Sequence, residues 1–370
     1  MGEPIRILQM IGSLNVGGSQ AMIINLYKNI DRTKVQFDFI LDHPKETYFK
    51  DTVMELGAKV YEMPTFTGKN YFQVRKAWKD FFVSHPEYRV LHSHVRSYAS
   101  IYIPIAKKYG VKTIIHSHST SNGSGFSSLI KKILQYPLRY QADYFMGCSK
   151  EAGEWLFGKK IANSDKYNII KNAIHANDYR YNSKYEDEYR KKLGLINSSV
   201  YIHIGRFHKS KNHEFLLDVF KKIKEVQTNA ILLLVGDGEL RDEIVNKISL
   251  LNLEDSVLIL GNRNDVPKIL QVADVCLFPS LWEGLGIVAI EAQAAGVPCI
   301  CSFGVPEEVA ITNECYFLPL DEIMWVNKAV LLKKDRRDTY LEVVKAGYDI
   351  CMSSKWMERF YLDKILVDKM

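Results

Sequence analysis

The stretch from residue 275 to residue 292, VCLFPSLWEGLGIVAIEA, joins an apolar run, a glycine-containing loop and the first turns of a helix. Short apolar runs followed by longer amphipathic stretches recur on both sides of it, a pattern typical of βαβ units with a parallel sheet covered by helices. Because α/β proteins place ligand sites at the carboxyl ends of such strands, the stretch predicts both an α/β fold class and the position of a functional site.

The alternation runs in two series, which a polar stretch without sustained periodicity separates at residues 175–189. A chain of 370 residues also exceeds what one hydrophobic core usually serves. We therefore expect an N-terminal Rossmann-like domain at 1–176, completed by a crossing helix at 352–370, and a C-terminal one at 190–351. The expected strands are 6–11, 35–41, 59–63, 90–94, 113–116, 144–148 and 168–172, then 199–205, 230–236, 256–260, 275–279 and 298–301.

Composition indicates an ordinary globular protein, with 47% apolar and 25% charged residues. The six cysteines form no CxxC pair, so we expect reduced core thiols rather than disulfides or metal ligands. The first apolar run, 5–11, is too short for a signal sequence, and no apolar run reaches the roughly 18 residues of a membrane span. These observations predict a cytoplasmic protein.

Charge is distributed unevenly along the chain. Residues 1–176 contain 24 Lys and Arg against 14 Asp and Glu, and no acidic residue occurs between Glu87 and Asp143. Such a field favours an anionic partner or surface. Within this window basic residues alternate with apolar ones near 126–136, which predicts either contact with an anionic membrane surface or a solvated face over a core helix. We expect no nucleic-acid partner.

The opening stretch contains two glutamates, Glu283 and Glu291, the first in the loop and the second in the helix. Two carboxylates can thus face one ligand site. Gly284 and Gly286 allow backbone amides to approach a ligand, and the helix N-terminus offers unpaired N–H groups to a diphosphate. The alternative is a glycine-containing turn with two exposed glutamates.

A second motif, Gly205-Arg206-Phe207-His208-Lys209-Ser210-Lys211-Asn212, follows the first strand of the second series. Arg206 and Lys211 would neutralise a leaving diphosphate, unless the motif is only a solvated basic loop. Gly17 and Gly18 follow the first strand of the chain and indicate a loop near phosphate and acceptor. The full GxGxxG fingerprint of dinucleotide-binding proteins is absent.

Histidines occur at two strand ends, as His92-Ser93-His94 and His116-Ser117-His118. Metal binding is the rival interpretation, but four histidines without a nearby carboxylate or thiolate make a poor zinc set. No Asp-x-Asp triplet is present to hold a diphosphate through a divalent ion. We expect no metal and no cofactor.

With these motifs in this order, the chain resembles the retaining GT-B glycosyltransferases of glycosyltransferase family four, particularly bacterial capsule and exopolysaccharide members. The resemblance covers nearly the whole chain. It implies two Rossmann-like domains facing across a cleft, with the C-terminal helix returning to the N-terminal domain. It departs at residues 172–175, where Asn-Ala-Ile-His replaces the family's Asn-Gly-Ile-Asp, and at Leu285-Gly286-Ile287, which lacks the commoner proline.

The resemblance also assigns roles to single residues. It implies that Glu291 binds the ribose hydroxyls and Glu283 the donor sugar, while Arg206 and Lys211 bind the diphosphate. The remaining implied contacts are the backbone amides of Leu285 and Gly286 to the diphosphate, Asn262 and Arg263 to the nucleobase, Gly17 and Gly18 in the closing loop, and His118 beside sugar and acceptor. His116 lies two positions before His118.

The implied activity is transfer of a hexose-type sugar from a nucleotide diphosphate sugar, linked to UDP or GDP, to a glycan or polyprenyl-linked acceptor. Such an enzyme would work at the inner face of the plasma membrane in polysaccharide biosynthesis. Rivals are a sugar-nucleotide epimerase of the same fold and a non-catalytic partner subunit of another transferase. An NAD-dependent oxidoreductase fits less well, because its glycine fingerprint is missing.

Overall fold

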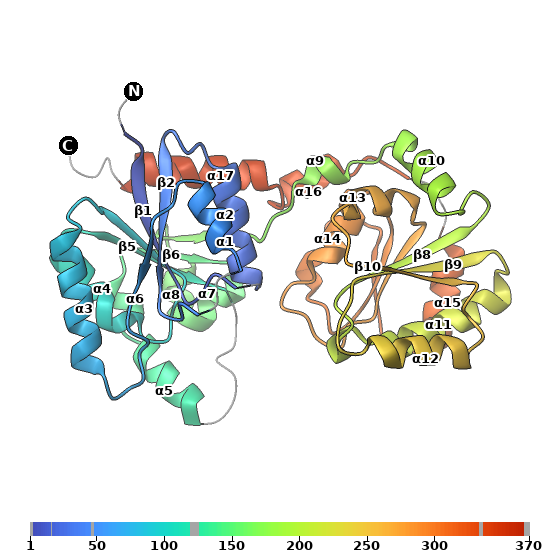
Figure 1. The fold of residues 1–370 in the computed structure, drawn as a ribbon, viewed down its shortest axis with the longest axis horizontal. Helices are drawn as coiled ribbons and strands as arrows, with labels where there is room; N and C mark the ends of the chain where they lie inside the picture. Colours follow the sequence, from blue (N-terminus) through green and yellow to red (C-terminus); the bar gives the residue numbers. More distant parts are fainter. Residues whose placement is uncertain (1–2, 16, 46–47, 119–125, 333–335, 366–370) are drawn as a thin grey trace. The chain divides into compact units, whose positions relative to one another are not determined.

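The computed structural model of the chain describes residues 3–15, 17–45, 48–118, 126–332 and 336–365 (Figure 1). The chain divides into two compact units. The first comprises the residues up to Ala173 together with the segment from Ile350 onward, and the second comprises Ile174–Asp349. In the described part of the chain, no helix combines the length and apolar character needed to cross a membrane.

The first unit contains a seven-stranded parallel sheet in the order β3-β2-β1-β4-β5-β6-β7. Its strands are β1 (Ile5–Ile11), β2 (Val35–Leu41), β3 (Val60–Glu62), β4 (Val90–Ser93), β5 (Lys112–Ser117), β6 (Tyr144–Gly147) and β7 (Tyr167–Ile169). Its helices are α1 (Gly18–Asn29), α2 (Lys50–Glu55), α3 (Tyr71–Ser84), α4 (Ala99–Lys108), α5 (Phe126–Gln135), α6 (Leu138–Gln141), α7 (Lys150–Phe157), α8 (Lys159–Ala162), α17 (Ile350–Arg359) and the π-helical turn η4 (Phe360–Ile365).

Side chains of β1 alternate between two cores, as expected for a strand buried on both faces. Ile7 and Ile11 pack with residues of α1 and α17 on one face. Leu8 and Met10 pack with residues of α3 and α4 on the other. Figure 1 shows α1 and α17 beside each other, and the two helices are in contact. The returning C-terminal helix expected from the sequence therefore completes one core of the first unit.

The second unit contains a six-stranded parallel sheet in the order β10-β9-β8-β11-β12-β13. Its strands are β8 (Ser199–Ile204), β9 (Ala230–Val235), β10 (Val257–Gly261), β11 (Val275–Phe278), β12 (Cys299–Ser302) and β13 (Cys315–Leu318). Its helices are α9 (Ala176–Tyr179), α10 (Ser183–Lys192), α11 (His213–Val226), α12 (Arg241–Leu250), α13 (Val266–Ile269), α14 (Ile287–Ala294), α15 (Glu322–Leu331) and α16 (Tyr340–Lys345), with single 3₁₀ turns η1 (Lys209–Lys211), η2 (Leu270–Val272) and η3 (Glu307–Val309).

Both units thus have the α/β architecture predicted from the sequence, two parallel Rossmann-like sheets with helices on both faces. Two local expectations differ from the structure. The stretch 175–189 was expected to be a linker followed by the start of a helix; α10 begins in it as expected, but the linker part also contains the short helix α9, whose Tyr179 packs on the second sheet's core. Strand β13 was not expected from the sequence, although its four residues are apolar; in the fold they are only partly buried.

A buried ion pair ties α10 to the second sheet. The guanidinium of Arg190, a residue only 6% exposed, donates to Asp274 Oδ1 at 2.8 Å. Asp274 Oδ2 accepts the backbone N–H of Val200 at 2.7 Å, so this carboxylate also joins the starts of β8 and β11. Glu186 provides a second carboxylate for the guanidinium at 2.8 Å.

Replacing Asp274 with alanine should leave the buried guanidinium of Arg190 short of one carboxylate, and we expect the free energy of unfolding of the second unit to fall by roughly 3 kcal/mol. Urea unfolding followed by circular dichroism measures this. Asp338→Ala is the matched control, because its ion pair with Arg180 is about half exposed. It should cost less than about 1 kcal/mol. Equal losses in the two variants would contradict the assignment.

Candidate functional site

The predicted basic motif forms the connection from β8 to α11. Lys211 ends the 3₁₀ turn η1, and Asn212 has a positive φ of 56° before α11 begins. The aliphatic stem of Lys211 lies over Gly205, where an added Cβ would approach the Lys211 side chain to 3.1 Å. Glycine at position 205 therefore leaves room for the lysine to lie along the end of its own strand.

Lys211 and Glu283 form an ion pair, although 72 residues separate them in sequence. Lys211 Nζ lies 2.5 Å from Glu283 Oε1, and the same oxygen accepts a hydrogen bond from the Ser280 hydroxyl at 2.6 Å. The ammonium group also lies 4.9 Å from the centre of the Phe278 ring. The side chains of Lys211 and Glu283 are 16% and 13% exposed, so the pair is shielded from solvent yet reachable.

Sheet order explains why the two loops meet. Strands β8 and β11 are parallel neighbours, paired through Tyr201 and Val275, so their carboxyl ends lie at the same edge. Backbone hydrogen bonds then join the loops: Leu281 donates to the Ser210 carbonyl at 2.7 Å, and Glu283 donates to the Gly304 carbonyl at 3.0 Å. The site is consequently held by main-chain contacts as well as by the ion pair.

Helix α14 begins directly after Leu285 and Gly286. Gly286 has a φ of 89°, and a Cβ there would lie 3.0 Å from both Phe278 and Val305. As a glycine at the N-cap, Gly286 offers no side chain to cap the amino end of α14. Unpaired amides at a helix N-terminus attract anions, so this turn can receive a phosphate group next to the Lys211–Glu283 pair.

Glu291 lies one turn further along α14 and is held by a different partner. Its Oε1 accepts a hydrogen bond from the Tyr179 hydroxyl at 2.7 Å. Burial raises the pKa of the Glu291 carboxyl to about 7, and the Tyr179 hydrogen bond opposes that rise. Glu291 is therefore a carboxyl group that titrates near neutral pH.

Arg206 does not join the Lys211–Glu283 pair. Its side chain is 72% exposed and donates to Glu239 Oε2 at 3.1 Å. Glu239 follows Gly236-Asp237-Gly238, where Gly236 has a φ of 131° and approaches the Gly205 carbonyl so closely that a Cβ would lie 2.1 Å from its oxygen. The loops after β8 and β9 therefore run side by side.

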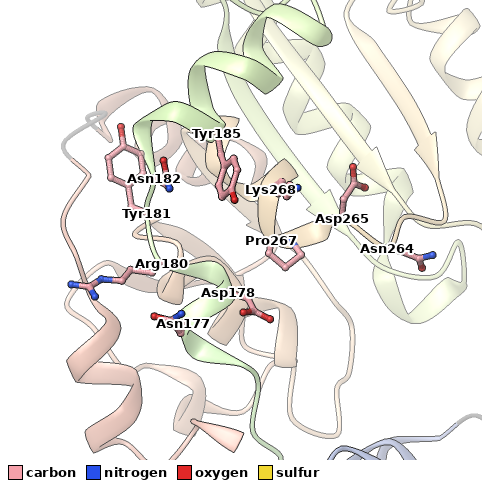
Figure 2. A pocket seen from close by; sticks show the side chains of 10 residues that line it. All are labelled: Asn177, Asp178, Arg180, Tyr181, Asn182, Tyr185, Asn264, Asp265, Pro267 and Lys268. Atoms are coloured by element: carbon pink, nitrogen blue, oxygen red, sulfur yellow. The ribbon is translucent and has the colours of Figure 1, made fainter. Parts of the chain in front are cut away.

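Asn262 and Arg263 follow β10, which stands two places from β8 in the sheet. Arg263 binds Asp265 at 2.7 Å, and Tyr189 donates to the same carboxylate at 2.8 Å. The hydrogen bond from Arg263 lowers the pKa of Asp265 to about 2. Beside this group lies a polar cavity of about 600 Å³ (Figure 2), lined by Asn177, Asp178, Arg180, Tyr181, Asn182, Tyr185, Asn264, Asp265, Pro267 and Lys268.

The remaining predicted residues belong to the first unit. Gly17 and Gly18 lie at the amino end of α1, where Gly18 faces open space. His118 follows β5, is partly exposed, and its Nε2 lies 2.7 Å from Nδ1 of His94. His116, in contrast, is fully buried. Of the two histidines, His118 is the one that solvent reaches.

Three partners of the predicted residues were not identified from the sequence: Ser280, Tyr179 and Glu239. Ser280 stands inside the quoted motif, so its position next to Glu283 was available as a signal. Tyr179 and Glu239 lie 112 and 33 residues from their partners Glu291 and Arg206. No spacing rule connects such distant positions.

Comparison with known proteins gives two family matches that together span most of the chain. The family described as "Glycosyltransferase Family 4" matches residues 16–178, and "Glycosyl transferases group 1" matches residues 186–339. EpsF of Bacillus subtilis (strain 168), which is named as a glycosyltransferase, is 30% identical over 309 residues, or 82% of this chain and 80% of EpsF.

Another relative is the Escherichia coli protein named UDP-Gal:alpha-D-GlcNAc-diphosphoundecaprenol alpha-1,3-galactosyltransferase. It is 28% identical over 264 residues, which is 68% of this chain and 67% of that protein. Among solved structures, Anabaena Alr3699/HepE in complex with UDP and glucose has a TM-score of 0.71 at 18% identity, covering 97% of this chain and 100% of that one. At this identity the likeness concerns the fold.

The raised pKa of Glu291 predicts a pH-dependent stability. Because the folded carboxyl titrates near 7 rather than at its ordinary 4.5, the native state binds the extra proton between these values, and the free energy of unfolding should fall as pH rises through this window. We expect a decline on the order of 2 kcal/mol that Glu291→Gln removes. Urea unfolding of both proteins at pH 5 and pH 7.5 measures it; identical pH profiles would contradict the prediction.

Proposed function

Because the chain belongs to glycosyltransferase family 4 and has the GT-B architecture, we propose that it transfers a hexose-type sugar from a UDP-sugar to a glycan or lipid-linked acceptor, with retention of anomeric configuration. The second unit would bind the donor and the first unit the acceptor. The product would enter a cell-surface polysaccharide. We propose a donor linked to UDP rather than GDP, because HepE was solved in complex with UDP and the E. coli relative is named for a UDP-galactose donor.

The observation that carries this proposal is the convergence of Lys211, Glu283 and the amino end of α14. A cation, a carboxylate and unpaired amides then lie at one edge of one sheet. A diphosphate needs the cation and the amides, and a sugar offers hydroxyl donors to the carboxylate. A nucleotide diphosphate sugar presents both groups side by side.

In the proposed reaction the bond between the sugar C1 and the diphosphate oxygen breaks, and negative charge develops on the leaving diphosphate. Lys211, Arg206 and the amides of Leu285 and Gly286 would stabilise that charge where it forms. Arg206 is exposed and held only by Glu239, so its side chain can turn toward a bound anion at small cost. Lys211 would exchange part of its contact with Glu283 for the phosphate.

The acceptor hydroxyl would form its bond to C1 on the face that the diphosphate leaves, and its proton would pass to the departing phosphate oxygen. Glu283 would then hold hydroxyls of the donor sugar, and Glu291 those of the ribose. Asn262 and Arg263 would bind the nucleobase. His118 would lie beside sugar and acceptor, and Gly17 and Gly18 would close over the diphosphate. These assignments need no metal ion at the leaving group.

Replacing Lys211 with alanine tests the central assignment. Loss of one preorganised charge partner of a leaving group typically costs about 3 kcal/mol, so kcat should fall roughly 100- to 1,000-fold. Product formation from UDP-glucose or UDP-galactose and an undecaprenyl-diphosphate-linked sugar measures kcat, and nuclear magnetic resonance of the product reports the anomeric configuration.

Lys209→Ala is the matched control, because Lys209 stands in the same 3₁₀ turn and is exposed. It should leave kcat near that of the unchanged chain. Full turnover by the Lys211→Ala variant would refute the role given to this lysine, and an inverted anomer would refute retention. A donor-only incubation that isomerises the sugar would instead favour an epimerase.

We further propose that helix α5 of the first unit rests on an anionic membrane surface, which suits a lipid-linked acceptor. Several apolar side chains of this region are exposed, namely Leu129, Ile130, Ile133, Tyr136 and Tyr140. Lys131, Lys132 and Arg139 lie among them, with the Arg139 guanidinium 4.3 Å from the centre of the Tyr136 ring. Apolar and basic side chains along α5 and the adjoining α6 match the chemistry of an anionic lipid interface.

Replacing Lys131 and Lys132 together with alanine should weaken binding to vesicles of phosphatidylglycerol and phosphatidylcholine by roughly 30-fold, at about 1 kcal/mol per lysine. Sedimentation of the full chain with vesicles measures this. The double replacement of Lys159 and Lys160, an exposed basic pair on α8, is the control and should retain binding. Equal sedimentation with purely neutral vesicles would refute the electrostatic contact.

A further inference from the structure

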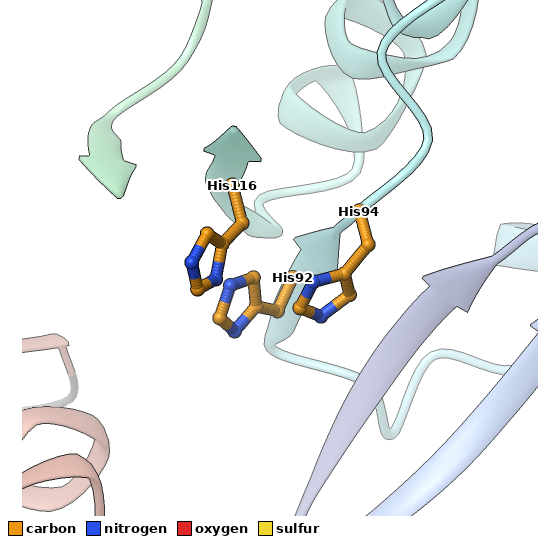
Figure 3. A group of neighbouring side chains, drawn as sticks. All are labelled: His92, His94 and His116. Carbon is orange, nitrogen blue, oxygen red and sulfur yellow. The ribbon is translucent and has the colours of Figure 1, made fainter. Parts of the chain in front are cut away.

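Four histidine rings gather at the carboxyl ends of β4 and β5. The His92 and His94 ring centres are 4.4 Å apart, and those of His116 and His118 are 4.1 Å apart. Across the two strands, His92 and His116 lie 5.4 Å apart with nearly parallel rings. Figure 3 shows His92, His94 and His116 side by side, and one ring nitrogen of each lies within 4.8 Å of those of the other two.

Several of these nitrogens are buried without a hydrogen-bond partner. Within the described residues, both ring nitrogens of His116 and Nε2 of His92 have none, and the two residues are 0% and 1% exposed. A neutral imidazole always carries one N–H donor and one lone pair. Leaving such a buried polar atom unpaired costs about 1–3 kcal/mol of folding free energy, so His116 destabilises the fold unless a ligand binds its nitrogens.

The other nitrogens of the group have partners of the kind that orient metal-binding histidines. His92 Nδ1 lies 2.6 Å from the Tyr361 hydroxyl, and His94 Nε2 lies 2.9 Å from the Gln9 side-chain oxygen. Outer contacts of this type fix the tautomer and leave the opposite nitrogen facing the ion. Here they leave His92 Nε2 without a partner and turn His94 Nδ1 toward His118, whose Nε2 lies 2.7 Å from it.

We propose that His92, His94 and His116 bind one divalent transition-metal ion. Nitrogen ligands of this kind select zinc, cobalt, nickel or copper over magnesium and calcium, which prefer oxygen. A set of three histidines leaves a further coordination position. His118 Nε2 lies 2.7 Å from His94 Nδ1 and can occupy that position after a small shift of either ring.

One further property suits the site to a metal. His118 is partly exposed, which provides an entry path from solvent. The absence of a carboxylate or thiolate in the sequence neighbourhood is therefore no obstacle, since three imidazoles suffice.

The proposed ion would be held by the first unit alone, whereas the leaving diphosphate is assigned to cations and amides of the second. The proposal is thus separate from the assignment of the leaving diphosphate. The bound ion would orient the His118 ring, either by binding it directly or through its contact with His94. Metal binding can be measured without donor or acceptor, so failure of this proposal and failure of the proposed function are distinguishable.

The test is titration of the chelator-stripped, tag-free chain with Co²⁺, read by the visible absorption of the ion in a nitrogen ligand field. Elemental analysis after dialysis against Zn²⁺ gives the stoichiometry. We expect one ion per chain, and His116→Ala should weaken Co²⁺ binding at least about 100-fold. Tyr361→Phe removes only the hydroxyl beside His92 Nδ1 and should weaken binding roughly 10-fold.

His85→Ala is the matched control, because His85 belongs to the same unit but is partly exposed and lies beside Glu87. It should bind one ion as the unchanged chain does. Thermal unfolding establishes whether each variant folds. If His116→Ala does not fold, the Co²⁺ affinity of Tyr361→Phe decides the outcome. Absence of Co²⁺ absorption in the unchanged chain overturns the proposal. So does full Co²⁺ affinity in a folded His116→Ala variant, or in the Tyr361→Phe variant where His116→Ala does not fold.

Discussion

The parallel pairing of β8 with β11 is the constraint on which the rest of the second unit depends. It places two loops at one edge of the sheet, and these loops carry the cation and the carboxylate that meet there. Without the pairing, Lys211 and Glu283 would be two charges 72 residues apart with no common ligand. The contact is therefore a consequence of strand order and would be lost with it, whatever the local loop sequences.

Glycines allow the backbone to come close enough for this arrangement. Gly205 makes room for the stem of Lys211, and Gly236 lets the next loop approach the Gly205 carbonyl. At Gly286 the positive φ turns the chain into α14 so that the helix begins beside the ion pair. Larger residues at these positions would separate loops that the sheet has brought together.

The first unit has a group of buried polar side chains at the carboxyl ends of its strands, where the second unit has the Lys211–Glu283 ion pair. Gln9 of β1 contacts His94, which follows β4, and Tyr361 of the C-terminal segment contacts His92 of β4; Gln9 also donates to the Tyr361 hydroxyl at 3.3 Å. Residues 352 positions apart in the chain thus meet around one group. The C-terminal segment therefore does more than cover a core, because it supplies a polar partner inside the sheet edge.

The sequence by itself determined the α/β class, the two series of strands, the loops that carry Lys211 and Glu283, and the helix that carries Glu291. These features depend on local periodicity and on glycine positions, which neighbouring residues express directly. Only the tertiary structure decided that Lys211 binds Glu283, that Arg206 binds Glu239, and that the Tyr179 hydroxyl donates a hydrogen bond to Glu291.

The short helix α9 and the gathering of His92, His94 and His116 into one group likewise needed the folded chain. The sequence shows that each histidine lies at the end of a strand. The distances between their nitrogens, however, are set by the register between β4 and β5 and by the rotamers of the rings. Those distances depend on packing between segments that are far apart in the chain, and no local pattern encodes them.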